Sequence, residues 1–167
     1  MSGFSIEWLN LREVSDHRAR DKHLLKTAAD WLNNLESKDK VIVDLGSGTG
    51  STIRGLQKYT TLAPSIQWRL VDNDPEVLAE AIHRHSGEYS IESFLVDLSE
   101  TQKLPLESVS LMTASALLDL VSENFIRDLC QLIKEKNKCR PVGFYSALNY
   151  DGCIKWTPFH SLDAAIL

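Results

Sequence analysis

The sequence predicts a single α/β domain built around a doubly wound parallel sheet with helices on both of its faces. Five short apolar runs have the length of buried strands, at residues 41–45, 66–71, 91–96, 109–113 and 141–148. Segments with helical periodicity separate these runs. Strands that alternate with helices pair in parallel, because each helix returns the chain across the sheet. A chain of 167 residues is long enough for one such domain.

The composition is that of a soluble globular protein, with 43% hydrophobic and 25% charged residues. The formal net charge of -5 lacks the positive field that nucleic-acid binding needs, so we expect no nucleic-acid partner. No apolar run approaches the ~20 residues that span a bilayer, and residues 1–10 do not resemble a signal peptide. We therefore expect a cytoplasmic protein with no membrane partner. Its cysteines, Cys130, Cys139 and Cys153, are expected to be reduced and mostly buried.

Capping residues mark where the predicted helices begin. Ser15 is positioned to cap a helix that continues to residue 35, and a glycine turn opens a helix over 51–59. Asp74, followed by proline, predicts another helix start, and Ser122 predicts the start of the last helix before the fifth strand.

The run from Val41 to Gly50 reads VIVDLGSGTG, a buried strand with an acid near its end and a glycine-rich turn. Glycine occupies alternate positions of the turn, at Gly46, Gly48 and Gly50. This spacing lets the backbone turn tightly and approach a ligand more closely than a Cβ would allow. The acid, Asp44, suits a ligand with ammonium or hydroxyl groups better than a pyrophosphate. A dinucleotide site would require Gly-x-Gly-x-x-Gly, and the third position of that pattern is Ser51.

Polar or small side chains also follow the next three strands. Asp72 and Asn73 follow the second strand, where a carboxylate can accept both hydroxyls of a ribose. Asp97 and Leu98 follow the third, where an acid can accept an adenine amino group and a leucine can pack on the ring. Ser115 follows the fourth. Because parallel strands end at one edge of the sheet, we expect these residues to surround a single ligand.

In the segments VDLGSGTG, RLVDNDPEVL, FLVDLSE and TASALLDLVS, the sequence resembles the class I (Rossmann-like) S-adenosylmethionine-dependent methyltransferases. The resemblance covers about residues 41–150. It is strongest toward bacterial small-molecule methyltransferases, through LREVSDHRARDKHLL near the N-terminus and GFYSALNYDG near the fifth strand. It implies that the chain binds S-adenosylmethionine, transfers the methyl group to a small-molecule acceptor and releases S-adenosylhomocysteine.

The resemblance also implies which residues contact the cofactor. Those near its methionine part would be Asp44, Gly46, Gly48, Gly50, Ser115 and Arg20, and the three glycines would also contact the ribose. Those on its ribose and adenine would be Asp72, Asn73, Asp97 and Leu98. Asp44 would lie near the ammonium group and Asp72 on the ribose hydroxyls. Arg20 could pair with the carboxylate of the cofactor, or it could lie on a solvated helix face.

No catalytic base is evident in the sequence. Asp119, just after the fourth strand, is the candidate, and a carboxylate at a helix start is the alternative interpretation. No metal site is expected, because His83 and His85 are two residues apart and do not share a helical face.

The family's sheet usually has seven strands, the last two forming an antiparallel pair. Few residues follow Leu148, and 161–167 resemble the start of an amphipathic helix, so we expect the pair to be missing and the chain to be truncated. In this interpretation residues 1–40 form a helical cap or lid, and 41–167 form an incomplete cofactor-binding domain. The exposed edge of the fifth strand would then permit a homodimer.

Two other functions remain open on the sequence. The chain could be a non-catalytic S-adenosylmethionine-binding domain, or it could be a nicotinamide-dependent oxidoreductase. A methyltransferase would form S-adenosylhomocysteine, whereas a non-catalytic binding domain would not. An oxidoreductase would bind NAD instead of S-adenosylmethionine.

Overall fold

The structure is a computed structural model that describes residues 4–37, 39–138, 140–150, 152–154, 156–158 and 160–162. Its strands are β1 (Val41–Leu45), β2 (Gln67–Asp72), β3 (Ser90–Leu95), β4 (Val109–Ser115) and β5 (Gly143–Ala147). Its helices are α1 (Ile6–Ala19), α2 (Lys22–Asn34), α3 (Ser51–Tyr59), α4 (Pro75–His85), the short 3-10 helix η1 (Thr101–Lys103) and α5 (Glu123–Asn137).

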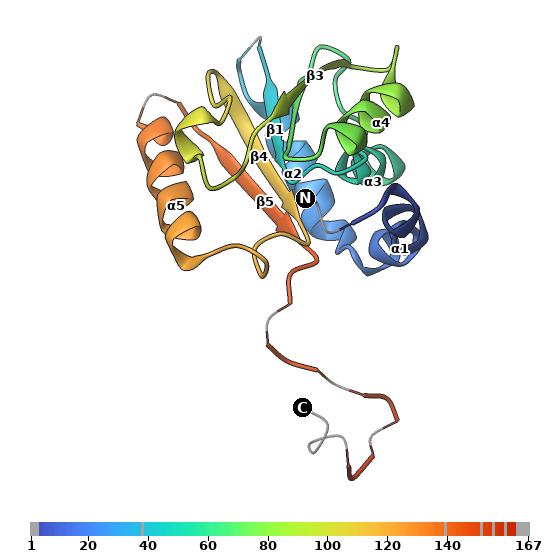
Figure 1. Ribbon diagram of the computed structural model, residues 1–167. Coiled ribbons are helices and arrows are strands. Elements are labelled where there is room, and N and C mark those ends of the chain that lie inside the picture. The colour runs from blue at the N-terminus through green and yellow to red at the C-terminus, as the bar shows by residue number, and fades with distance from the viewer. Residues whose placement is uncertain are drawn as a thin grey trace.

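The five strands form one parallel sheet in the order β3-β2-β1-β4-β5 (Figure 1). The order reverses beside β1, which pairs with β2 on one side and β4 on the other. At its carboxyl end Leu45 lies between Val71 and Ala114, so the three central strands finish at the same level. The predicted doubly wound parallel sheet is confirmed, and the described residues contain no antiparallel strand pair.

Two apolar cores hold helices against the two faces of the sheet, because successive residues of a strand point to opposite sides. On one face α2, α3 and α4 pack through Leu25, Ile53 and Leu78 around the fully buried Trp68. On the other face α5 packs through residues such as Phe125. In Figure 1 α5 lies across the sheet from α3 and α4. Helices on both faces, as predicted, follow from this alternation.

The N-terminal segment differs from the single helix predicted over 15–35. Two helices are present, and Ser15 lies inside the first of them instead of capping it. The side chain of Ser5 caps α1, and Asp21 caps α2 by accepting from the Leu24 amide at 3.0 Å. Arg20 has an extended backbone and separates the two helices. Asp21 therefore starts a new helix, because its side chain satisfies an amide that a continuous helix would bond internally.

The structure also bears on the cysteines and the C-terminal segment. Cys130 and Cys153 are exposed, so the expectation of mostly buried thiols is wrong for both, and Cys139 lies outside the described residues.

Residues 161–162 form a turn, and the rest of the helix expected there, 163–167, is not among the described residues. No helix in the described part of the chain is long and apolar enough to cross a membrane.

Gly143, the first residue of β5, allows α2 to pack closely on the sheet. A Cβ at this position would lie 2.7 Å from Cζ3 of Trp31 and 3.0 Å from Cδ1 of Leu111. We expect Gly143→Ala to lower the free energy of unfolding by about 1–3 kcal/mol through overpacking, measured by urea denaturation. The penalty should shrink in a Trp31→Leu background, and an equal penalty in both backgrounds would argue against the clash.

Candidate functional site

A cavity of about 540 Å³ lies at the edge of the sheet where the parallel strands end. The loops after β1 to β4 line it, and α1 contributes side chains as well. Eight residues predicted to bind a cofactor line this cavity: Arg20, Gly46, Gly48, Asp72, Asn73, Asp97, Leu98 and Ser115. The structure thus brings together residues that are widely separated in the sequence, because the loops that carry them follow strands of one sheet.

Three predicted residues do not line the cavity. Asp119 is exposed, in the turn that follows β4. Gly50 is buried against α4, where an added Cβ would lie 2.9 Å from Nε2 of His85. Asp44 is 1% exposed at the end of β1. Gly50 and Asp44 are packed inside the domain beside the glycine turn, and their contact with a cofactor stays a prediction.

The glycine turn is held to the neighbouring strand by hydrogen bonds. Gly46, Gly48 and Gly50 have φ values of 61°, 52° and 80°, in the left-handed region that glycine favours. The Gly48 amide donates to Oδ2 of Asp72 at 2.8 Å, and the Ser47 amide donates to the Val71 carbonyl at 3.0 Å. The turn therefore keeps a fixed position relative to the end of β2.

Asp44 is a buried carboxyl group with one satisfied oxygen. Thr113 donates from Oγ1 to Oδ1 of Asp44 at 2.6 Å, and Oδ2 has no hydrogen-bond partner within the described structure. Burial raises the pKa of Asp44 to about 6, although the Thr113 hydrogen bond and the charge of Arg20 both oppose the rise. Asp44 consequently loses its proton in a pH range where most carboxyl groups are already charged.

The two other acids of the site differ from each other in environment. Asp72 accepts from the amides of Gly48 and Asp74, and burial raises its pKa despite these bonds. Asp97 is exposed and accepts from the Ser99 amide at 2.8 Å, and hydrogen bonding to Ser99 lowers its pKa. Both carboxylates retain lone pairs for a ligand, since each can accept about four hydrogen bonds.

Arg20 is a buried cation that faces the cavity. It is 3% exposed, and its Nε and Nη1 atoms have no hydrogen-bond partner among the residues that the structure describes. Gly55 leaves room for it, because a Cβ there would lie 3.2 Å from Arg20 Nε. A buried guanidinium with unused donors is costly unless an acceptor reaches it. This geometry differs from that of a solvated helix face.

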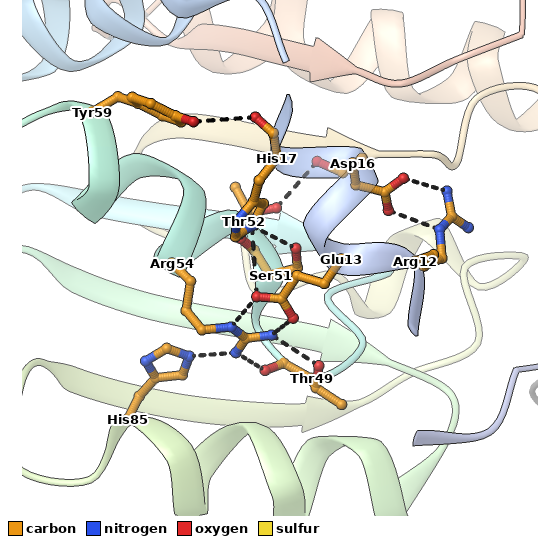
Figure 2. Close-up of polar contacts among 11 residues, drawn as sticks. Arg12, Glu13, Asp16, His17, Thr49, Ser51, Thr52, Arg54, Tyr59 and His85 are labelled. Carbon is orange, nitrogen blue, oxygen red and sulfur yellow. Dashed lines mark hydrogen bonds and ion pairs between the residues drawn. The ribbon is translucent and has the colours of Figure 1, made fainter. Parts of the chain in front are cut away.

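A polar network that the sequence did not reveal joins α1 to the glycine turn (Figure 2). Arg54 donates from Nε and Nη2 to the two carboxylate oxygens of Glu13, each at 2.6 Å. Its Nη1 donates to the Thr49 carbonyl at 2.5 Å and lies 3.0 Å from Nε2 of His85. His17 of α1 lies 3.1 Å from Oγ of Ser51. Sequence spacing gave no signal for the contacts of Glu13, His17 and His85, because their partners are at least 31 positions away in the chain.

Apolar side chains form another wall of the cavity, and the sequence gave no clear signal for it. Leu117, Leu120 and Leu148 follow β4 and β5 and line this wall, together with Ala116. Ala116 and Leu148 have φ values of 50° and 62°, a left-handed backbone conformation that residues other than glycine rarely adopt. The Ala116 amide donates to the Ala147 carbonyl at 2.9 Å, and this bond ties the loop after β4 to the end of β5.

The fold resembles that of a solved methyltransferase. The plantazolicin methyltransferase BpumL, in complex with a monoazolic desmethylPZN analog and SAH, matches with a TM-score of 0.52 and 16% sequence identity. The match covers 75% of this chain and 46% of BpumL, so the chain spans about half the length of that protein. This chain has the class I methyltransferase fold.

Two other methyltransferases align with this class I fold at lower TM-scores. Phosphoethanolamine N-methyltransferase 1 from Haemonchus contortus gives 0.47 at 15% identity, over 82% of this chain and 30% of that chain. A putative S-adenosyl-L-methionine-dependent methyltransferase from Methanococcus maripaludis gives 0.47 at 16% identity, over 72% and 54%. No protein-family model matches the sequence, and no curated protein matches it.

The raised pKa of Asp44 predicts a pH-dependent stability in this class I fold. The folded protein holds the Asp44 proton more tightly than the unfolded chain, so the stabilisation is present below pH 3.8 and is lost as pH rises through about 6. Relative to Asp44→Asn, the wild type should therefore lose about 2 kcal/mol of unfolding free energy between pH 4 and 7, since one pKa unit corresponds to about 1.4 kcal/mol and part of the effect lies below pH 4. Urea denaturation at a series of pH values measures this difference.

Asp97→Asn is the matched control, because the pKa of Asp97 is lowered and its contribution has the opposite sign. The Asp97 contribution is present above the unfolded pKa and is lost as pH falls through the folded pKa. Parallel pH profiles for the wild type and Asp44→Asn would show that Asp44 does not titrate in this range.

Proposed function

We propose that this chain binds S-adenosylmethionine and transfers its methyl group to a small-molecule acceptor. The observation that carries this proposal is that one cavity is lined by the buried guanidinium of Arg20 and by the partly buried carboxylate of Asp72. A ligand with a carboxylate and vicinal hydroxyls, connected by a flexible chain, would satisfy both groups. S-adenosylmethionine has these features.

The amino-acid part of the cofactor would lie beside Arg20. The guanidinium of Arg20, which lines the cavity, would donate to the cofactor carboxylate. The backbone of the glycine turn at Gly46 and Gly48 lines the same cavity and leaves room for close approach. Asp44 would act through the electrostatic field beneath the site, since it does not line the cavity.

The adenosine part would lie along the loops after β2 and β3. Asp72 would accept the ribose hydroxyls, while its bonds from the Gly48 and Asp74 amides keep the carboxylate oriented. Asn73 and Asp97 would bind polar atoms of the adenine, and Leu98 would pack on its face. Each of these residues lines the cavity, and this position supports the proposal because ligands of open parallel sheets usually bind at the edge where the strand order reverses.

The sulfonium group of bound S-adenosylmethionine supplies an activated methyl group for in-line attack by an acceptor atom. The protein's part is to position the acceptor and to exclude water. The apolar wall of Leu117, Leu120 and Leu148 suits both tasks, because it offers shape without competing hydrogen bonds. An acceptor with a free lone pair needs no general base, whereas a protonated acceptor would need one, for which the exposed Asp119 is the candidate.

Binding of the cofactor is testable by calorimetric titration with S-adenosylmethionine and NAD side by side. We expect binding of S-adenosylmethionine and none of NAD. Asp72→Ala and Arg20→Gln should each weaken binding by roughly 1.5–3 kcal/mol, the usual loss for a hydrogen bond to a charged group. Arg18→Gln, which changes an exposed arginine of α1 two residues before Arg20, is the control and should bind like the wild type. Binding of NAD without S-adenosylmethionine would instead support an oxidoreductase.

Methyl transfer is tested separately from binding. The wild type is incubated with S-adenosylmethionine and a panel of small amines, thiols and phenols, and release of S-adenosylhomocysteine is measured by mass spectrometry. We expect at least one acceptor to raise release above the rate without acceptor, and Asp72→Ala to lower that rate by tenfold or more at subsaturating cofactor. Tight binding with no release across the panel would favour a non-catalytic binding domain.

A further inference from the structure

Helix α1 has an unusual distribution of side chains. Its polar residues Arg12, Glu13 and Asp16 are partly buried on the inner face, while Trp8 and Leu11 on the outer face are 47% and 73% exposed. Within Ile6–Ala19, all of which the structure describes, His17 is the residue classed as buried. The helix is therefore attached to the domain mainly by polar contacts and has little apolar core beneath it.

Arg54 is the centre of this attachment. Its planar guanidinium contacts three separate elements: Glu13 of α1, Thr49 of the glycine turn and His85 of α4 (Figure 2). The pairing with Glu13 uses both carboxylate oxygens, and the two side chains are only 17% and 21% exposed. Burial alone would raise the pKa of Glu13, but the hydrogen bonds and charge of Arg54 lower it below its usual value. The pair is thus charged and well oriented.

His85 limits the geometry that Arg54 can adopt. Arginine has no acceptor, so Nε2 of His85 accepts from Arg54 Nη1, and the proton of the neutral ring is on Nδ1. Nδ1 lies 3.8 Å from the carboxylate of Glu88. Burial, and then the charge of Arg54, lower the pKa of His85 and favour this neutral form. His85 and Thr49 together fix the orientation of the Arg54 guanidinium, which donates to the Glu13 carboxylate.

The position of α1 in turn affects the position of Arg20. Arg20 is the residue at the C-terminal end of α1, and its amide donates to the Asp16 carbonyl at 3.1 Å. Helix α2, on the other side of Arg20, is anchored independently by the fully buried Leu25 and Leu32. A shift of α1 would therefore move the Arg20 backbone about this junction and leave the main core in place.

We propose that Arg54 is a positioning residue for Arg20: by pairing with Glu13 it seats α1 on the glycine turn, and this seat places the Arg20 guanidinium where the carboxylate of a ligand binds. The inference rests on the proposed function, because it assigns the Arg20 end of the cavity to the amino-acid part of S-adenosylmethionine. It predicts that breaking the pair affects that part of the ligand and spares the adenosine part.

The test compares two probes by calorimetry: S-adenosylhomocysteine, which carries the amino-acid carboxylate, and 5′-methylthioadenosine, which lacks it. Glu13→Gln should lower the affinity for S-adenosylhomocysteine about tenfold, the size expected for one misplaced charge-assisted contact, and leave that for 5′-methylthioadenosine within about twofold. Arg54→Lys keeps the positive charge but loses the bidentate contact with Glu13, and it should give the same selective loss of affinity for S-adenosylhomocysteine. Glu123→Gln, which breaks an exposed Arg127–Glu123 pair on α5, is the matched control and should change neither affinity.

Equal losses for the two probes in Glu13→Gln and Arg54→Lys, or no loss for either probe, would overturn the positioning role, because a merely structural contact does not distinguish the halves of a ligand. A wild type that binds neither probe would refute the proposed function, and the positioning role with it. A wild type that binds both, with unselective variants, would refute the positioning role alone. Thermal melts of each variant confirm that the folded domain is what binds.

Discussion

The hydrogen bond from the Gly48 amide to the Asp72 carboxylate is the contact on which the geometry of the cavity depends. It joins the glycine turn after β1 to the acid at the end of β2, and the parallel register of these strands brings both to one level. The Ser47 amide, which donates to the Val71 carbonyl, also ties the turn to β2, but the Gly48 bond is the one that reaches a side chain lining the cavity. With it, the bare backbone of the turn and the carboxylate form one rigid surface, and the network of Arg54 extends that surface to α1.

Much of the fold follows from the sequence, because the central strands are buried on both faces and read as continuous apolar runs. The strand ends differ from prediction by one or two residues, as at Ser115, since a strand end has no distinctive composition. The N-terminal helix was the larger error. Apolar spacing continues through the break at Arg20, and only the side chain of Asp21, bonded to the Leu24 amide, shows that a second helix begins there.

The candidate site was predictable to the extent that it lies at strand ends. Asp72 and Asp97 follow strands and line the cavity, whereas Asp44, at the end of a central strand, is covered by its neighbours. The pairing of Glu13 with Arg54 could not be predicted, because no motif connects two residues 41 positions apart. The apolar wall was equally hidden, since leucines after a strand are usually interpreted as core.

The backbone of that apolar wall has a consequence for the stability of the domain. Ala116 and Leu148 hold left-handed conformations that cost roughly 1–2 kcal/mol each and that glycine would adopt freely. These two backbone conformations, where the ends of β4 and β5 reach the cavity, therefore make the domain less stable than it could be. In return, the cavity wall carries a methyl and an isobutyl group at positions where glycine would leave only peptide backbone.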